Sequence, residues 1–158
     1  MAKRAGTGLD VLTKRLKAIK AKDIMTEYVI TTTENTTLAE VAGLMIKTRV
    51  SGFPVVGKKG KIVGVITSTD LFIVMDMIKS GDVAQNGFAG IRKPTVKFAM
   101  STDVVRIKKS TTLDKIIALM KYRNLHTLPV MEGNQMVGVI GRRDVFKNFY
   151  AAEKDLCL

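Results

Sequence analysis

The chain repeats itself, and this duplication constrains the fold more than any other feature. The stretch VGVITSTD at residues 63–70 returns as VGVIGRRD at residues 137–144. Upstream, residues 22–55 align with residues 97–130 at an offset of 75, which becomes 74 after a shorter turn in the second copy. One length change in a glycine-rich turn keeps all the other matches in register. We therefore expect two copies of one structural unit.

Each copy begins with a strand pattern and a helix pattern. Residues 27–33 (EYVITTT) are rich in β-branched residues and predict a strand. Thr37 and Glu40 have the spacing of a helix capping box, in which each residue satisfies a backbone N–H group of the other. The following residues predict an amphipathic helix with its apolar stripe in both copies. The stripe consists of Leu38, Val41, Ala42 and Met45, and then of Leu113, Ile116, Ile117 and Met120.

A hairpin and a second helix complete each copy. The runs FPVV and KIVGVIT flank the turn GKKG and predict two antiparallel strands. A helix is expected to begin near Thr69 and to end near Gly81, because glycine commonly follows the last helical turn. The residues expected to point inward are Leu71, Val74, Met75 and Ile78, and in the second copy Val145, Phe146, Phe149 and Tyr150.

The remaining segments set the expected organisation. A repeat of about 50 residues buries too little surface to be comfortably stable alone, so the two copies should share an interface. Leu9, Leu12, Leu16 and Ile19 follow a candidate cap at Asp10 and predict a short helix that packs on the repeats or on a partner. The expected divisions are a basic N-terminal helical segment at 1–21, repeats at 22–79 and 97–150, a linker at 80–96 and a tail at 151–158.

Three motifs occur in the same order in both copies and carry a family resemblance. They are KDIMT and KFAMS, RVSGFPVV and NLHTLPVM, and GVITSTD and GVIGRRD. With these motifs the sequence resembles a tandem CBS-domain pair (Bateman module) of the stand-alone prokaryotic type. The resemblance implies an α/β (α+β) fold of two β-α-β-β-α repeats related by a pseudo-two-fold axis, which usually forms a homodimer. It also implies a regulatory role, in which clefts between the repeats bind AMP, ADP, ATP or S-adenosylmethionine.

Elementary chemistry supports a nucleotide at the start of the second helix. A strand that leads into a helix points free backbone N–H groups and the positive end of the helix dipole at one place, which favours phosphate. Asp70 and Asp144 are acceptors, and they suit the two vicinal hydroxyls of a ribose. The alternative is that a threonine caps the helix and the aspartate only complements the dipole, an effect of about 0.5–2 kcal/mol.

The resemblance assigns the candidate ligand-binding residues to two clefts, each combining a segment before one hairpin with the helix start of the other repeat. Cleft A comprises Thr26, Ile30, Val50, Ser51, Gly52, Arg142, Arg143 and Asp144. Cleft B comprises Ser101, Val105, Leu125, His126, Thr127, Thr67, Thr69 and Asp70. His126 is the only histidine, and it is included as a candidate phosphate contact.

The two clefts should differ in their preference for phosphate. Gly141 replaces the serine or threonine that is usual in the family, and Arg142 and Arg143 place two positive charges at a helix N-terminus, where they oppose the dipole. An anion relieves this conflict, and guanidinium groups bind phosphate oxygens in a bidentate way. We expect cleft A to prefer the more highly phosphorylated ligand. The alternative is that both arginines point to solvent.

Composition excludes several function classes and leaves two alternatives open, one of which is a scaffold with empty clefts that stabilises a partner enzyme or transporter. The sequence contains no Walker loop, HExxH, GxSxG or CxxC motif, and its single cysteine is Cys157, so we expect a non-enzymatic module that needs no cofactor or metal. A cytoplasmic location and no membrane span are expected. The net charge is +12, and residues 1–22 hold seven lysines and arginines against one aspartate. The rival reading is therefore a nucleic-acid- or anionic-surface-binding protein that uses the repeats as a dimerisation scaffold.

Overall fold

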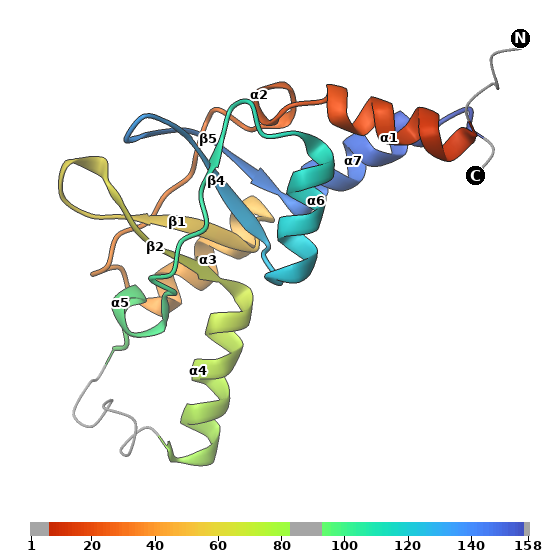
Figure 1. The fold of residues 1–158 in the computed structure, drawn as a ribbon. Coiled ribbons are helices and arrows are strands. Elements are labelled where there is room, and N and C mark those ends of the chain that lie inside the picture. Colours follow the sequence, from red (N-terminus) through yellow and green to blue (C-terminus); the bar gives the residue numbers. More distant parts are fainter. Residues whose placement is uncertain (1–6, 83–92, 157–158) are drawn as a thin grey trace, which may run out of the picture. The chain divides into compact units, whose positions relative to one another are not determined.

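The computed structural model describes residues 7–82 and 93–156, and these form mixed helical and strand structure (Figure 1). The chain divides into two compact units. The central unit is continuous and runs from Ile30 to Val105, whereas the terminal unit combines Met1–Val29 with Arg106–Leu158. The chain therefore passes from the terminal unit to the central unit and back again.

The central unit contains a hairpin flanked by helices. Its elements are α3 (Leu38–Thr48), β1 (Gly52–Val56), the short helix η1 (Lys58–Gly60), β2 (Ile62–Thr67), α4 (Ser68–Ser80) and α5 (Val96–Ala99). β1 and β2 pair antiparallel, with Gly52 opposite Thr67, so the predicted hairpin is confirmed. The predicted end of the second helix is also confirmed, because Gly81 follows α4 with a left-handed φ of 77°.

The terminal unit has a three-stranded sheet in the order β3-β4-β5. Its elements are α1 (Gly8–Ala18), α2 (Ala21–Ile24), β3 (Ile107–Lys108), α6 (Leu113–Tyr122), β4 (Thr127–Glu132), β5 (Gln135–Gly141) and α7 (Arg142–Glu153). β3 runs parallel to β4, and β4 pairs antiparallel with β5.

The predicted N-terminal helix is confirmed as α1, which packs against α6 and α7 and buries Leu12 and Leu16. Its cap differs from the expectation. Thr7 is the N-cap and Asp10 is the third helical residue, which accepts a hydrogen bond from the Thr7 N–H group at 3.0 Å. The Nη1 atom of Arg15 donates to the carbonyl oxygens of Ala152 and Lys154, at 2.7 and 3.1 Å, and so satisfies the C-terminal end of α7.

The first helix of the first copy is capped as the sequence predicts, whereas the N-cap residue of α6, Thr112, makes no side-chain capping bond to the helix backbone. The hydroxyl and amide of Thr37 donate to Glu40 at 2.7 and 2.9 Å, which confirms the predicted capping box. In the second copy Lys115 occupies the place of Glu40, and the Thr112 hydroxyl donates to Asp114 instead. The threonine hydroxyls lower the pKa of Glu40 and that of Asp114, because the bonds favour the charged carboxylates.

The segment that leads into each copy packs on the hairpin of the other copy. The amide of Ala21 donates to Thr111 O at 2.7 Å, and Thr26 forms a two-way backbone bridge with Val139 of β5. In the central unit the amide of Val96 donates to Thr36 O at 2.8 Å, and Ser101 bridges Val65 of β2 in the same way. The two lead-in segments therefore make equivalent contacts, each with the other copy of the repeat.

The strand predicted at residues 27–33 is wrong. Within this segment only Thr32 makes a β-bridge, to Val55 of β1 in the central unit. Thr26, which immediately precedes the segment, bridges Val139 in the terminal unit. The reason is that the chain changes units between Val29 and Ile30, so no continuous ladder is available along the segment. The equivalent residues of the second copy do form the short strand β3.

The inward faces of the second helices are narrower than predicted. Leu71, Val74 and Val145 are buried, as expected. Met75 and Ile78 are instead 53% and 55% exposed. In the second copy Phe146 and Tyr150 are exposed as well, whereas Ala152 is buried. In α4 the inward stripe continues through Met77, which packs on the core of the central unit, rather than through Met75 and Ile78.

Candidate ligand-binding helix entrances

In the central unit, β2 ends at the residue that caps α4. Both the amide and the hydroxyl of Thr67 donate to the Oδ2 atom of Asp70 at 2.7 Å. The amide of Asp70 points back to the Thr67 hydroxyl at 3.5 Å. The capping role considered for this pair is therefore realised. It occupies Oδ2, and in the described part of the chain no hydrogen bond is found to Oδ1 of Asp70.

In the terminal unit the same entrance lacks the hydroxyl. The amide of Gly141 donates to Oδ2 of Asp144 at 2.8 Å, and this single bond replaces the two that Asp70 receives from Thr67. The carboxylates of Asp70 and Asp144 thus have equivalent positions in the two units. Asp144 keeps more of its acceptor capacity for another group.

The two arginines at the terminal entrance have different surroundings. The guanidinium of Arg142 donates from Nε to Leu125 O and from Nη2 to Asn124 Oδ1, both at 3.0 Å. Asn124 is in the left-handed region with a φ of 49°, so Arg142 holds a tight turn just before β4. Arg143 is exposed. The structure therefore gives Arg142 a bracing role within its own unit and leaves Arg143 accessible at the helix N-terminus.

The residues assigned to cleft A are divided between the units. Thr26 lies beside β5, through its bridge with Val139, and β5 leads directly into the entrance at Gly141. Four of the residues therefore belong to the terminal unit: Thr26, Arg142, Arg143 and Asp144. The other four belong to the central unit: Ile30, Val50, Ser51 and Gly52.

The residues assigned to cleft B are divided in the mirror-image way. Ser101 lies beside β2, which leads into the entrance at Thr67. Five residues belong to the central unit: Ser101, Val105, Thr67, Thr69 and Asp70. The other three belong to the terminal unit: Leu125, His126 and Thr127. His126 is half-buried, and Thr127 is buried in β4 opposite Gly141.

Within the central unit, the segment before the hairpin touches the helix entrance directly. The amide of Ser68 donates to Ser51 O at 2.8 Å, and Gly52 is the β1 partner of Thr67. The members of the two predicted clefts therefore meet at the end of this hairpin. Each unit presents a segment before its hairpin and an acidic helix entrance side by side.

Two glycines that position these segments were not recognised from the sequence. A Cβ atom on Gly64 would lie 2.7 Å from Sδ of Met100 and 2.9 Å from Ser101 O. One on Gly138 would lie 2.6 Å from Sδ of Met25. The missing side chains allow the lead-in segments, with Thr26 and Ser101, to lie flat on β5 and β2. The signal was present, because both glycines and both methionines are identical between the copies.

Other kinds of site find no support in the described residues. Residues 7–82 and 93–156 contain no group of three or more histidine, cysteine, aspartate or glutamate side chains that could hold a metal ion. Among the same residues, no helix combines the length and apolarity that crossing a membrane requires. Cys157 lies outside the described residues.

Comparison with known proteins identifies the fold family. The CBS domain model matches the chain twice, at residues 21–76 and 96–151. Inosine-5'-monophosphate dehydrogenase of Methanocaldococcus jannaschii is 30% identical over 129 residues, which cover 81% of this chain and 23% of that enzyme. Protein MJ1225 of the same organism is 30% identical over 151 residues, or 90% of this chain and 53% of that protein. The chain thus spans between about a quarter and a half of these relatives.

Solved structures agree with the family match. The CBS domain pair of protein MJ0100, in complex with 5-methylthioadenosine and S-adenosyl-L-methionine, superposes with a TM-score of 0.69 at 26% identity. The superposition covers 84% of this chain and 96% of that one. The crystal structure of MJ1225 gives a TM-score of 0.71 at 31% identity, over 91% of this chain and 54% of that one. The chain therefore belongs to the CBS domain family, as a tandem pair of CBS repeats with an α+β fold.

Proposed function

We propose that this CBS pair is a non-enzymatic regulatory module that binds an adenosine-containing ligand. The observation that carries the proposal is the equivalent acidic helix entrance in each unit. Asp70 and Asp144 are fixed through Oδ2 by the residue that precedes the helix. The first amides of α4 and α7 lie beside them. A ribose hydroxyl would bind the free carboxylate oxygen, and a phosphate group would bind the N-terminal amides.

The two sites would each use both units. In cleft A the segment Val50–Gly52 would face the entrance at Asp144, and in cleft B the segment Leu125–Thr127 would face the entrance at Asp70. Extended backbone before each hairpin proline would read the edge of the base through its amides and carbonyls. The contacts of Thr26 with β5 and of Ser101 with β2 support this assignment, because they bring one further member of each cleft to its own entrance.

The ligand class follows from the site chemistry and from one relative. The CBS pair of MJ0100 is in complex with S-adenosyl-L-methionine and 5-methylthioadenosine, which are both adenosine derivatives. AMP, ADP and ATP have the same base and ribose, so they belong to the same candidate group. In cleft A the exposed guanidinium of Arg143 would favour the ligands that carry more phosphate.

Binding would act by population shift. A ligand that bridges both units favours one arrangement of them, by no more than its differential affinity for that arrangement. The partner that reads this arrangement would be a second copy of the chain or another cytoplasmic protein. A homodimer is supported by the apolar residues that α4 exposes, Phe72, Ile73, Met75 and Ile78, because contiguous exposed apolar side chains commonly mark interfaces.

A melting-temperature panel tests the proposal. The panel contains AMP, ADP, ATP and S-adenosylmethionine, and a binding ligand at about 100 times its Kd should stabilise the folded state by about 2.7 kcal/mol. Asp70→Asn and Asp144→Asn should each remove part of the rise in melting temperature that the ligand causes. Asp76→Asn, on the exposed face of α4, is the matched control and should keep the full rise. If no adenosine ligand raises the melting temperature, the proposal fails.

The arginine contribution has its own experiment. Calorimetric titration of AMP and ATP should show that Arg143→Ala lowers the preference for ATP. Arg142→Ala should instead lower the affinity for AMP and for ATP to a similar extent, since Arg142 braces the turn at Asn124. An ATP preference that survives in the Arg142→Ala/Arg143→Ala double variant would contradict a phosphate role for either residue.

The rival function is supported by the exposed lysines Lys14, Lys17, Lys20 and Lys22 on and after α1. These would bind the phosphate backbone of a nucleic acid or an anionic lipid surface. Filter binding of DNA and RNA over a range of salt concentrations discriminates, because backbone contacts predict a steep loss of affinity with salt. Salt-independent or absent binding would contradict this rival function.

A further inference from the structure

The exposed side of α4 in the central unit is apolar and carries one acidic residue. We call it the central face, and it consists of Phe72, Ile73, Met75, Asp76 and Ile78. The four apolar side chains are between 51% and 68% exposed. Asp76 is exposed as well, and within the described chain it has no hydrogen bond or ion pair. Figure 1 shows the C-terminal end of α4 extending beyond the hairpin of its own unit, which leaves this face open.

The second helix of the terminal unit also exposes apolar side chains, but its exposed charges have the opposite sign. Phe146 and Tyr150 of α7 are 58% and 65% exposed. Lys147 is exposed beside them and, within the described chain, has no hydrogen bond or ion pair. Among the described residues of α6 and α7 every exposed charge is positive, and these residues are Lys115, Lys121, Arg143 and Lys147. The acidic residues of the same helices, Asp114, Asp144 and Glu153, are half-buried.

A groove of about 270 Å³ lies between α6 and α7. It is lined by Ile117, Met120, Lys121, Arg142, Val145 and Phe146. The guanidinium of Arg142 is already bonded within the unit. The exposed Lys121 lies 5.2 Å from the ring centre of Tyr122, a contact that does not neutralise its charge. The groove therefore has a mostly apolar lining and one accessible cation.

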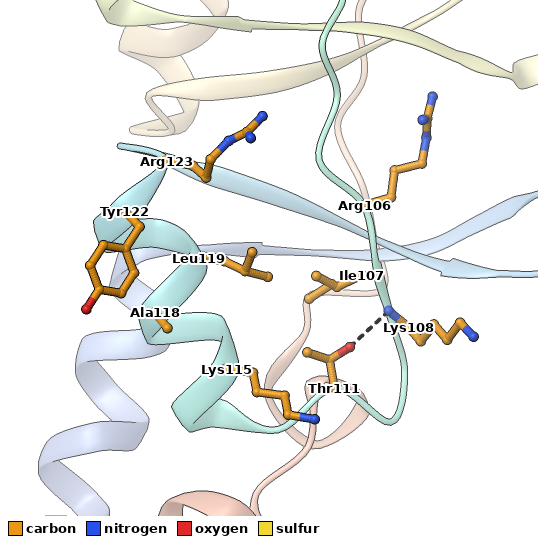
Figure 2. A pocket seen from close by; sticks show the side chains of 9 residues that line it. All are labelled: Arg106, Ile107, Lys108, Thr111, Lys115, Ala118, Leu119, Tyr122 and Arg123. Carbon is orange, nitrogen blue, oxygen red and sulfur yellow. Dashed lines mark hydrogen bonds between the residues drawn. The ribbon is translucent and has the colours of Figure 1, made fainter.

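Figure 2 shows the other side of α6, which lies toward β3. There Leu119 points from the helix toward Ile107, and Lys115 and Ala118 line the same side. None of these residues lines the groove between α6 and α7. Lys121 thus belongs to the side that α6 shares with α7, whereas Lys115 does not. We call this shared side the terminal face, and its exposed residues are Lys121, Phe146, Lys147 and Tyr150.

The duplication shows where the two faces have diverged. Phe72 and Phe146 are equivalent in the register of the repeated motifs, and both are exposed. The next position is Ile73 in the first copy and Lys147 in the second. In the preceding helix, Ile46 corresponds to Lys121 in the same way. An exposed phenylalanine has therefore been retained in both copies, whereas two apolar neighbours in the first copy are lysines in the second.

From this difference we infer that two copies of the chain associate head to tail, with the central face of one copy on the terminal face of the other. Phe72 would pack against Phe146 and Ile117 of the second copy, at the groove. Asp76 would lie beside Lys147 and Lys121 of the second copy. Because each copy has both faces, two such contacts would close a two-fold dimer. The inference rests on the homodimer of the proposed function, and it does not depend on the adenosine ligand.

Charge favours this pairing over the alternative in which each face meets its own copy. Two terminal faces placed together would bring Lys121 and Lys147 against the same two lysines of the second copy. The desolvated cations would repel one another, which costs free energy in an interface. The central face has no such excess, because its exposed charges within the described length of α4 are Asp76 and Lys79. The head-to-tail arrangement gives the lysines of the terminal face an acidic neighbour.

Charge reversal tests the pairing, with the dissociation constant of the dimer measured by sedimentation equilibrium. Asp76→Lys and Lys147→Glu should each weaken the dimer about tenfold or more, which corresponds to about 1.4 kcal/mol. Each change places like charges together at both contacts. The double variant Asp76→Lys/Lys147→Glu restores opposite charges, so its dissociation constant should return to within about threefold of the wild type.

Matched controls make the same charge changes outside both faces. Glu27→Lys and Lys61→Glu alter exposed residues of the lead-in segment and of the central hairpin turn, and both should keep the wild-type dissociation constant. If the single variants dimerise like the wild type, or if their losses add in the double variant, the inference is wrong. A wild-type chain that stays monomeric would overturn both the inference and the proposed homodimer. The adenosine ligand is decided separately by the melting-temperature panel.

Cross-linking reads the orientation without changing either charge. Met75→Cys and Ala151→Cys place a thiol on exposed positions of α4 and α7, in chains that also carry Cys157→Ser. The two variants receive tags of different size, are mixed, and are treated with a short bismaleimide. Head-to-tail pairing should give products that contain one chain of each kind, and each variant alone should give none. Products that join two chains of the same kind would show head-to-head pairing and contradict the inference.

Discussion

The two units build the same helix entrance with different chemistry. In the central unit Thr67 and Asp70 satisfy one another, and the entrance is a complete capping box. In the terminal unit Gly141 contributes only its amide, and Arg142 and Arg143 follow where the central unit has Ser68 and Thr69. The aspartate is retained in both, whereas the residues around it are not. Duplication has thus preserved the backbone arrangement and allowed the side chains at the entrance to diverge.

The same contrast extends to the first helix of each copy and the segment before it. The second copy has four cations at Arg106, Lys108, Lys115 and Arg123, whereas the equivalent positions of the first copy hold Thr31, Thr33, Glu40 and Thr48. The apolar residues beneath are retained, since Leu44 and Leu119 occupy equivalent positions. At these positions the two copies therefore differ in charge, and they differ in shape as well, because only the second copy forms the short strand β3.

The largest expected difference between the units concerns the two glycines beneath the lead-in segments. Gly64→Ala should destabilise the protein by about 3 kcal/mol, because its Cβ would meet both Met100 and the backbone oxygen of Ser101. Gly138→Ala should cost about 1–2 kcal/mol, because its three nearest atoms all belong to the flexible side chain of Met25. Urea unfolding measures both values.

The tyrosines make this measurement specific to one unit. All three tyrosines, Tyr28, Tyr122 and Tyr150, belong to the terminal unit, and the chain has no tryptophan. Tyrosine fluorescence therefore reports the terminal unit, whereas far-ultraviolet circular dichroism reports both. A larger loss of stability in Gly138→Ala than in Gly64→Ala would break the proposed difference between the two contacts.

A smaller effect is expected from exchanging the caps. Thr67→Ala removes the hydroxyl from the central entrance and should cost about 1 kcal/mol. Gly141→Thr should stabilise the terminal unit by about 0.5 kcal/mol, because its φ of −100° and ψ of 170° suit threonine. The added Cβ would have ordinary contacts, the nearest at 3.6 Å from Asp144 Oδ2. Thermal unfolding measures both changes, and a destabilising Gly141→Thr would show that the glycine is required by the fold.

The smallest effect is the pH dependence contributed by the caps of the first helices. The Thr37 hydroxyl lowers the pKa of Glu40 from its ordinary value of 4.5, and the Thr112 hydroxyl lowers that of Asp114 from 3.8. A lowered carboxyl pKa stabilises the folded state above the ordinary value, and this contribution is lost as the pH falls through the folded-state pKa. Glu40→Gln and Asp114→Asn should therefore each flatten the acid limb of stability. The free energy of unfolding, measured by urea unfolding over a range of pH below the ordinary pKa values of 4.5 and 3.8, gives this dependence. If its slope against pH is the same in the variants and the wild type, the prediction is wrong.

Local chemistry in the sequence was sufficient to predict the elements that depend on neighbouring residues. The capping box at Thr37, the hairpin around GKKG and the end of α4 at Gly81 all follow from side chains within a few positions of one another. The division of the predicted strand at residues 27–33 could not be found in this way. It depends on which hairpin each end of the segment bonds to, and a duplicated sequence offers two equivalent hairpins.

The candidate site shows the same limit. The aspartates at the helix entrances follow from the repeated motif, and their bonds to residues three positions earlier follow from capping chemistry. The hydrogen bonds of Arg142 to Asn124 and Leu125 could not be predicted from local patterns, because they join residues 18 and 17 positions apart in the chain. Likewise, the exposure of Met75 and Ile78 depends on how much of α4 its own hairpin covers, which periodicity does not reveal.

The passage of the chain between the units has a consequence for biosynthesis. The central unit is one continuous stretch, so it can fold as soon as Val105 has left the ribosome. The segment with α1 and α2 is synthesised before the central unit, yet the strands and helices it packs against, β5, α6 and α7, are made after that unit. Leu12 and Leu16 therefore stay uncovered until α6 and α7 have been synthesised. A ribosome stalled after Val105 would carry a complete central unit, together with α1 and α2 that lack their packing partners.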